Sequence, residues 1–240
     1  MFKIKKFDPV ELPTKIKLLI YGSPGVGKTV FCSQFPSPLF IDSEKGMAAI
    51  EKQIDYVSIT NFEEFQELLK DIIENVEEYK KKYKTIVVDS VTELQKRSLD
   101  YILKKAVQNN ISRDPNLITQ QDWGKNTESM RKALRSLRDL SEHFNIVLTA
   151  LSREVSSEGN LIKRPDLTPS LFSSLNSYLD IMGYMMTKTE ENEDKKMEVT
   201  RYLIFANTNK FIAKSRIRNL SNVIKNPTWE KFNKSLKGGK

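Results

Sequence analysis

The stretch Gly22-Ser-Pro-Gly-Val-Gly-Lys28-Thr29 decides the fold of this chain. It completes the pattern G-x-x-x-x-G-K-[ST], in which backbone N–H groups wrap around phosphates at a helix N-terminus. An apolar run, Ile16 to Tyr21, precedes the stretch, and a helix-compatible run, Val30 to Gln34, follows it. Strand, loop and helix in this order predict a P-loop. We therefore expect a nucleoside triphosphate, ATP with Mg²⁺, to bind here.

Two side chains of the stretch have defined tasks. The Lys28 ammonium group would reach the β- and γ-phosphates, and the Thr29 hydroxyl group would hold Mg²⁺. The alternative is a glycine-rich turn that happens to precede Lys-Thr, and the flanking strand and helix disfavour it. The predicted ATP contacts are nine consecutive residues: Gly22, Ser23, Pro24, Gly25, Val26, Gly27, Lys28, Thr29 and Val30.

A second acid should organise Mg²⁺ from the end of a neighbouring buried strand. Asp89 fits this role, because Ile86, Val87 and Val88 before it predict such a strand. The alternative role for Asp89 is a helix cap, which Ser90 could share. We assign Asp89 to the metal.

Hydrolysis also needs a carboxylate that takes a proton from the attacking water. Many ATPases place a glutamate directly after the second acid, but Ser90 stands there in this chain. Two other carboxylates, Asp42 and Glu44, lie two residues apart at the end of the predicted strand 38–42. We assign Glu44 as the general base and Asp42 as a supporting or metal-shell group. The alternative is that both acids only end the strand and cap the next helix.

Bulk composition excludes several classes of protein. No apolar run approaches the ~20 residues of a membrane span, and no apolar segment of a signal peptide follows the basic N-terminus. A single cysteine, Cys32, excludes an internal disulfide. We expect a cytoplasmic protein without membrane contact.

Positive charge is concentrated towards the C-terminus. The net charge is +8, and residues 201–240 hold ten Lys and Arg side chains against one acid, Glu230. This balance favours an anionic partner, nucleic acid first, although a solvated lysine-rich tail fits equally well. We divide the chain into an ATPase domain at 1–225 and a basic C-terminal extension at 226–240.

The alternation of strand and helix patterns predicts an α/β fold with a mostly parallel sheet flanked by helices. Short connections after Leu151 suggest that antiparallel strands join the sheet C-terminally. The further elements expected are strand 56–59, helix 61–82, strand 85–89, a polar stretch 108–124, helix 127–144, strand 145–149, a loop or hairpin at 152–169, and strands 180–187, 199–205 and 211–213.

Two segments after the P-loop, Phe40-Ile-Asp-Ser-Glu44 and Ile86-Val-Val-Asp-Ser-Val91, resemble the RecA recombinase core. With Arg164-Pro-Asp-Leu-Thr-Pro169 and the Pro-Gly of the P-loop, they are more closely similar to phage-encoded RecA-like single-strand annealing ATPases. The resemblance covers about 15–229 and is strong only in the nucleotide motifs. It implies an ATPase of phage recombination, in the host cytoplasm, that binds single-stranded DNA and promotes annealing.

The resemblance also implies a homo-oligomer, because RecA-like ATPases form rings or filaments in which a neighbour supplies positive charge to the nucleotide. Lys214 and Arg216 match the segment that does so, with an ordinary basic patch as the alternative. The family sensor, often Gln, corresponds here to Ser152 or Arg153. A single-strand-binding protein is a further candidate partner.

RecA-like proteins bind DNA through loops after these strands, which correspond here to 108–124 and 153–169. Trp123 could stack on a base there, although a tryptophan at such a position more often packs a loop down. Lys125, Arg131, Arg135 and Arg138 form a basic stripe that we place on the helix face away from the core, where it could instead be merely solvated. The candidate DNA contacts are Trp123, Lys125, Arg131, Arg153, Lys163 and Arg164.

Two other functions stay open. A P-loop kinase acting on a small molecule could use Arg153 and Arg164 as a lid, and a helicase-type motor shares the RecA core. A GTPase is disfavoured, because the chain has no Asn-Lys-x-Asp motif to bind the guanine base.

Overall fold

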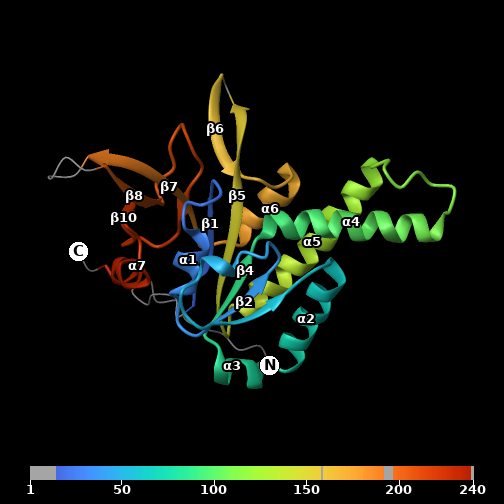
Figure 1. The fold of residues 1–240 in the computed structure, drawn as a ribbon, viewed down its shortest axis with the longest axis horizontal. Helices are drawn as coiled ribbons and strands as arrows, with labels where there is room; N and C mark the ends of the chain where they lie inside the picture. Colours follow the sequence, from blue (N-terminus) through green and yellow to red (C-terminus); the bar gives the residue numbers. More distant parts are fainter. Residues whose placement is uncertain (1–14, 158, 192–196, 239–240) are drawn as a thin grey trace, which may run out of the picture.

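The computed structural model describes residues 15–157, 159–191 and 197–238. In these ranges a ten-stranded sheet carries helices on both faces (Figure 1). The strands are β1 (Lys17–Gly22), β2 (Pro38–Asp42), β3 (Asp55–Ser58), β4 (Thr85–Asp89), β5 (Asn145–Ser157), β6 (Asn160–Pro165), β7 (Ile181–Glu191), β8 (Met197–Ile204), β9 (Lys214–Ser215) and β10 (Val223–Lys225). The helices are α1 (Lys28–Ser33), the short 3₁₀ helix η1 (Met47–Ala49), α2 (Phe62–Glu74), α3 (Val76–Lys82), α4 (Val91–Asn109), α5 (Gln120–Leu140), α6 (Pro169–Tyr178) and α7 (Trp229–Leu236).

The sheet has the order β10-β8-β7-β1-β5-β4-β2-β3, and the strands from β7 to β3 run parallel. The predicted α/β class with a mostly parallel sheet is therefore confirmed. Parallel strands end at one edge of the sheet, which brings the P-loop after β1 close to the ends of β2, β4 and β5. β8 pairs antiparallel with β7, and β10 pairs antiparallel with β8, as expected. β7 instead runs parallel to β1, because the chain passes through α6 before β7 begins.

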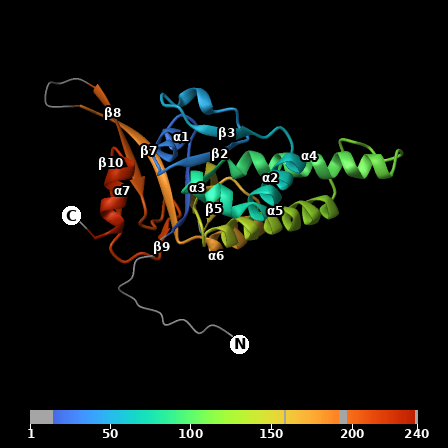
Figure 2. The ribbon, with the colours of Figure 1, turned by 90° about the horizontal axis from the view of Figure 1, so that it is seen from below.

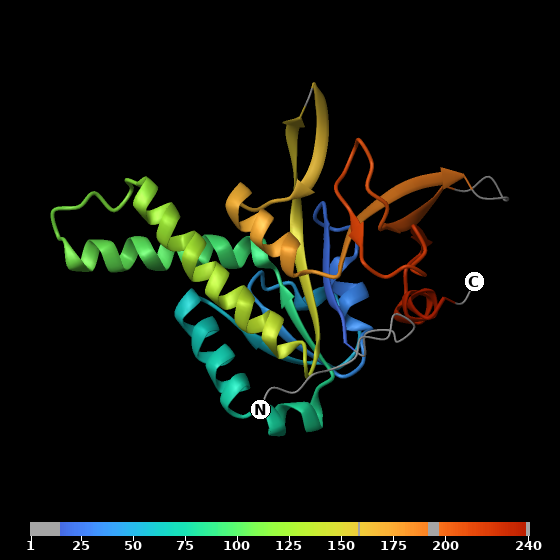
Figure 3. The same cartoon turned by 180° about the vertical axis from the view of Figure 1, so that it is seen from behind.

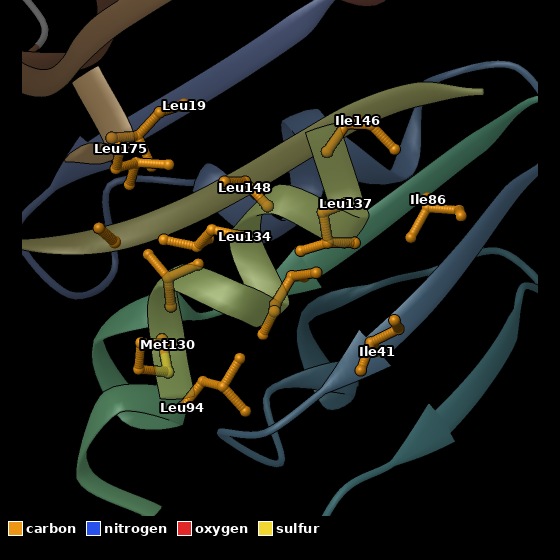
Figure 4. Close-up of a cluster of buried hydrophobic side chains, with 14 of the residues drawn as sticks. Leu19, Ile41, Ile86, Leu94, Met130, Leu134, Leu137, Ile146, Leu148 and Leu175 are labelled. Carbon is orange, nitrogen blue, oxygen red and sulfur yellow. The ribbon is translucent and has the colours of Figure 1, made fainter. Parts of the chain in front are cut away.

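Successive residues of the central strands face opposite sides of the sheet, and different helices cover the two sides. Leu19, Ile86 and Leu148 pack with α2, α4, α5 and α6 (Figure 4). Their neighbours Leu18 and Val87 pack with α1 and α7 on the other side. Burial on both faces explains why these strands are continuous apolar runs.

The paired helices α4 and α5 (Figure 2) and the β5–β6 hairpin (Figure 3) project from the body of the domain. The polar stretch predicted at 108–124 is shorter than expected, because Thr119 and Asp122 form a capping box that starts α5 at Gln120. Trp123 and Gly124 therefore lie in a helix and not in a loop. None of the described helices is long and apolar enough to cross a membrane.

Three other expectations need adjustment. The helix predicted at 61–82 is divided at Asn75 into α2 and α3. The segment 152–169 begins with the hairpin, in which Arg153 lies opposite Arg164. At 211–213 only an isolated β-bridge forms, between Phe211 and Lys163, and the Phe211 ring stacks on Tyr184 with ring centroids 4.8 Å apart.

The basic C-terminal segment packs onto the domain. Within the described residues after 225, α7 buries Phe232 completely, against Phe31, Phe35 and Phe205. Lys234 on the same helix is exposed. The hydrophobic core therefore includes residues on both sides of position 225.

Phe232→Ala should lower the free energy of unfolding by about 3–5 kcal/mol, because it leaves a cavity among aromatic side chains. Urea unfolding measures the change, and Lys234→Ala on the exposed face of α7 is the matched control. Equal stability of the two variants would contradict the burial of α7 in the core.

Candidate functional site

The P-loop joins β1 to α1 and depends on three glycines. Gly25 (φ 76) and Gly27 (φ 101) adopt left-handed backbone conformations, which a side chain would strain. Gly22 is needed for another reason, since a Cβ atom there would collide with the carbonyl oxygen of Met185 in β7. The loop is therefore shaped both by its own backbone and by the neighbouring strand.

Lys28 is buried within the loop. Its Nζ atom donates to the carbonyl oxygens of Gly22 at 3.0 Å and Ser23 at 2.9 Å. Burial lowers the pKa of the ammonium group, and the carboxylates of Asp89 and Glu44 act in the opposite direction. Lys28 thus places a positive charge next to the two carboxylates that we assigned to the metal and the water.

Asp89 ends β4, and both its carboxylate oxygens accept hydrogen bonds. Oδ2 accepts from the Thr29 hydroxyl at 2.6 Å, and Oδ1 accepts from the Thr149 hydroxyl of β5. A hydroxyl and one carboxylate suit Mg²⁺, which otherwise keeps water and phosphate ligands. The described residues contain no group of three or more His, Cys, Asp or Glu that would form a richer metal site. Thr29 and Asp89 are therefore the residues that fit the ion.

Glu44 follows β2, and its carboxylate accepts a hydrogen bond from the Ser90 hydroxyl. Ser90 in turn follows Asp89 through a cis peptide bond, and its N–H donates to the Ser43 hydroxyl at 3.0 Å. Glu44 is exposed, so water can reach it. Ser90 thus occupies the position at which many ATPases have a glutamate, and it contacts Glu44, which follows another strand.

Asp42 organises the turn that carries Glu44. Its Oδ1 atom accepts from the N–H groups of Glu44 at 3.1 Å and Gly46 at 3.2 Å. Arg97 of α4 supports the same turn, because its guanidinium donates to the Ser43 carbonyl at 2.6 Å. Asp42 thus supports the turn that carries Glu44, and its role at the metal stays a prediction. No sequence signal had singled out Arg97.

The sensor predicted at Ser152 lies in the β5–β6 hairpin, opposite Pro165. Thr149, three residues earlier and fully buried, is the β5 residue that contacts Asp89. Sequence reasoning missed it. The available signal was a hydroxyl directly after the apolar run Ile146–Leu148.

Lys214 and Arg216 lie beside the first residues of β7, at the edge of the sheet opposite the P-loop. The Lys214 ammonium donates to the carbonyl oxygen of Asn176, and burial lowers its pKa. Arg216 lies 3.8 Å from the Asp180 carboxylate and donates to the Ser177 carbonyl at 3.0 Å. Neither side chain contacts the P-loop of its own chain.

Trp123, in the first turn of α5, lines two cavities. One, of about 390 Å³, is lined by Trp123, Thr92 and Arg153 among others. The second, of about 350 Å³, is lined by Trp123 and Arg131, and both include Thr168. The Trp123 side chain is 40% exposed. The structure therefore brings together three of the six candidate DNA contacts.

The remaining DNA candidates are more dispersed. Lys125 is exposed on α5, and Lys163 and Arg164 lie in β6. Lys163 lies 3.6 Å from the Glu154 carboxylate, and Arg164 lies over the Phe172 ring at 5.7 Å.

The basic stripe on α5 does not face away from the domain as predicted. Arg131 donates to the Ser174 hydroxyl at 2.9 Å, and Arg135 donates to the Tyr178 hydroxyl at 3.2 Å. Arg138 lies over the same tyrosine ring at 5.1 Å. These arginines contact α6 because α6, absent from the expected elements, packs along α5.

A cavity of about 620 Å³ opens beside the P-loop. Gly27, Val30 and Phe31 form one part of its wall, and Met185 and Arg201 of the C-terminal strands form another. Its size suits the nucleoside part of a nucleotide. Val30 lines this cavity, and its contact with the nucleotide stays a prediction.

A P-loop, a paired threonine and aspartate, and a strand-end glutamate now lie in one site. A family model described as an AAA domain matches residues 14–217. The chain belongs to this family. As an AAA domain, it is a P-loop NTPase domain.

The SPbeta prophage-derived uncharacterized protein YorG of Bacillus subtilis (strain 168) is similar to this AAA domain, with 32% identity over 88 residues. That match covers 37% of this chain and only 27% of YorG. Among solved structures, the flagellar accessory protein FlaH from Methanocaldococcus jannaschii aligns with a TM-score of 0.43 and 12% identity. The alignment covers 80% of this chain and 78% of FlaH.

Thr149→Val should slow Mg²⁺-dependent ATP hydrolysis about 10- to 100-fold, because one oxygen of the Asp89 carboxylate loses its donor. Steady-state phosphate release at several Mg²⁺ concentrations measures the effect. Ser152→Ala on the same strand is the control and should retain activity. A larger loss of activity in Ser152→Ala than in Thr149→Val would contradict the assignment of Thr149 and favour Ser152 as the sensor.

Proposed function

We propose that this P-loop NTPase domain hydrolyses ATP in phage DNA recombination, binds single-stranded DNA and promotes strand annealing. The observation that carries the proposal is the position of the Trp123 cavities beside α4, the helix that starts directly after Ser90. The similarity to a prophage-derived protein supports the phage setting.

In the nucleotide site, the charge of Lys28 would stabilise the β- and γ-phosphates. Glu44, held by Ser90, takes a proton from the attacking water. Mg²⁺, held by Thr29 and Asp89, would supply charge neutralisation at the phosphate oxygens. The carboxylate and the ammonium group thus act on the water and the phosphate respectively.

At the DNA site, Trp123 is the stacking residue. An exposed indole that lines two cavities can accept a base, and stacking does not depend on base identity. Arg153, which lies 3.7 Å from the Asp166 carboxylate, borders one cavity, and Arg131 borders the other, so each cavity has a guanidinium group that phosphates could contact. This arrangement suits a single strand that is bound without sequence preference.

Hydrogen bonds link the two sites through α4. The Thr92 hydroxyl accepts from the Leu151 N–H at 3.1 Å. The Gln95 amide exchanges two hydrogen bonds with Thr168, at 2.8 and 3.2 Å. Thr92, Gln95 and Thr168 all line the larger Trp123 cavity. A strand bound there would therefore act on the helix whose N-cap, Ser90, holds the general base.

A ring or filament of identical subunits completes the proposal. Lys214 and Arg216 lie beside the first residues of β7 and bond to the end of α6, so we place their role at the nucleotide of a neighbouring subunit. A host or phage single-strand-binding protein would deliver the DNA, in the bacterial cytoplasm.

The proposal predicts that single-stranded DNA stimulates ATP hydrolysis and that Trp123→Ala removes the stimulation. The variant should weaken binding of oligo(dT) about 5- to 100-fold, the value of one lost base stack. Fluorescence anisotropy and phosphate release measure the two effects. Tyr56→Ala, an exposed aromatic residue on the edge strand β3, is the matched control.

Two further outcomes test the proposal. Binding of oligo(dT) should weaken steeply as salt increases, because phosphate contacts release counterions. Hydrolysis that ignores DNA, with no DNA binding, would contradict the proposal and favour a kinase with a small-molecule acceptor. Unwinding of duplex DNA coupled to ATP would favour the helicase-type motor.

A further inference from the structure

Arg201, in β8, lies directly against the P-loop. A Cβ atom built on Gly27 would come within 3.0 Å of the Arg201 Nε atom and 3.3 Å of its Cδ atom. Gly27 is the glycine immediately before Lys28, where the backbone N–H groups of a P-loop surround phosphate. A guanidinium group is therefore positioned at the edge of an anion-binding loop.

The Arg201 guanidinium forms no hydrogen bond or ion pair with another residue in the described part of the chain. The acids Glu51 and Glu198 line the same cavity without pairing with it. By contrast, five other arginines, Arg97, Arg113, Arg138, Arg153 and Arg216, bind or pair with a carbonyl or carboxylate oxygen. The charge of Arg201 is left available for a ligand.

The backbone of Arg201 is held in place. Its N–H donates to the Asn226 side chain at 3.0 Å, and its carbonyl oxygen accepts from the Asn226 N–H at 2.7 Å. Asn226 adopts a left-handed conformation (φ 44) and comes two residues before Thr228, the N-cap of α7. The position of Arg201 is thus tied to β10 and α7.

We propose that Arg201 contacts the α- and β-phosphates of the bound nucleotide, so that the C-terminal strands form part of the nucleotide site. Guanidinium groups bind phosphate oxygens through short, charge-assisted hydrogen bonds. The P-loop backbone beside Gly27 surrounds the α- and β-phosphates, whereas Lys28 extends to the γ-phosphate. The contact would therefore not distinguish ATP from ADP. This inference rests on nucleotide binding at the P-loop, but not on DNA binding.

Titration with fluorescent mant-ADP and mant-ATP in the presence of Mg²⁺, without DNA, tests the inference. Arg201→Ala should weaken both ligands about 10- to 100-fold, the value of a lost charge-assisted hydrogen bond. Arg201→Lys should recover part of the affinity, since it keeps the charge. Arg218→Ala, an exposed arginine before β10, is the control and should bind like the wild type.

Hydrogen exchange supplies a second readout. ADP should slow amide exchange in β8 and β10 of the wild type but not of Arg201→Ala. Unchanged affinity in Arg201→Ala would overturn the inference while leaving the nucleotide site intact. A loss confined to mant-ATP would also overturn it, because the contact would then be with the γ-phosphate. No mant-nucleotide binding by the wild type would overturn the nucleotide site itself.

Discussion

The arrangement of this domain depends on the buried carboxylate of Asp89. Its two oxygens accept hydrogen bonds from Thr29, which follows the P-loop, and from Thr149 of β5, so one side chain at the end of β4 connects the P-loop with the neighbouring strand. A buried carboxylate is costly without partners, and here both oxygens are satisfied by hydroxyl groups. The same hydroxyl of Thr29 is a Mg²⁺ ligand in P-loop proteins. The constraint that stabilises the sheet edge therefore also organises the nucleotide site.

From this edge of the sheet, α4 connects the nucleotide site to the larger of the Trp123 cavities. Its N-cap, Ser90, contacts the general base, and its second turn bonds to the segment that follows the hairpin. The C-terminal strands add to the site from the other side, because Met185 packs against Gly22 and Arg201 against Gly27. Segments far apart in sequence thus converge on the P-loop.

The nucleotide motifs were predictable because each has a short-range signal: glycines and Lys-Thr in the P-loop, and an acid after an apolar strand for Asp89. The parallel sheet followed from the alternation of patterns. Arg97 and Arg201 were not predictable, since their roles depend on long-range pairing between strands or helices. Thr149 carried only a weak signal, a hydroxyl directly after an apolar run, and its contact with Asp89 depends on the pairing of β4 with β5. Trp123 was placed in a loop because the Thr119–Asp122 capping box, which extends α5, was not recognised.

The most direct test of the account compares Glu44→Gln with the wild type in two assays, equilibrium binding of ATP and single-turnover hydrolysis. The account predicts nearly unchanged binding and hydrolysis slower by about 100-fold or more, because the amide cannot accept the proton of the water. Glu67→Gln, an exposed residue of α2, controls for the loss of a negative charge. Turnover by Glu44→Gln at nearly the wild-type rate would contradict the account and assign the base to another residue.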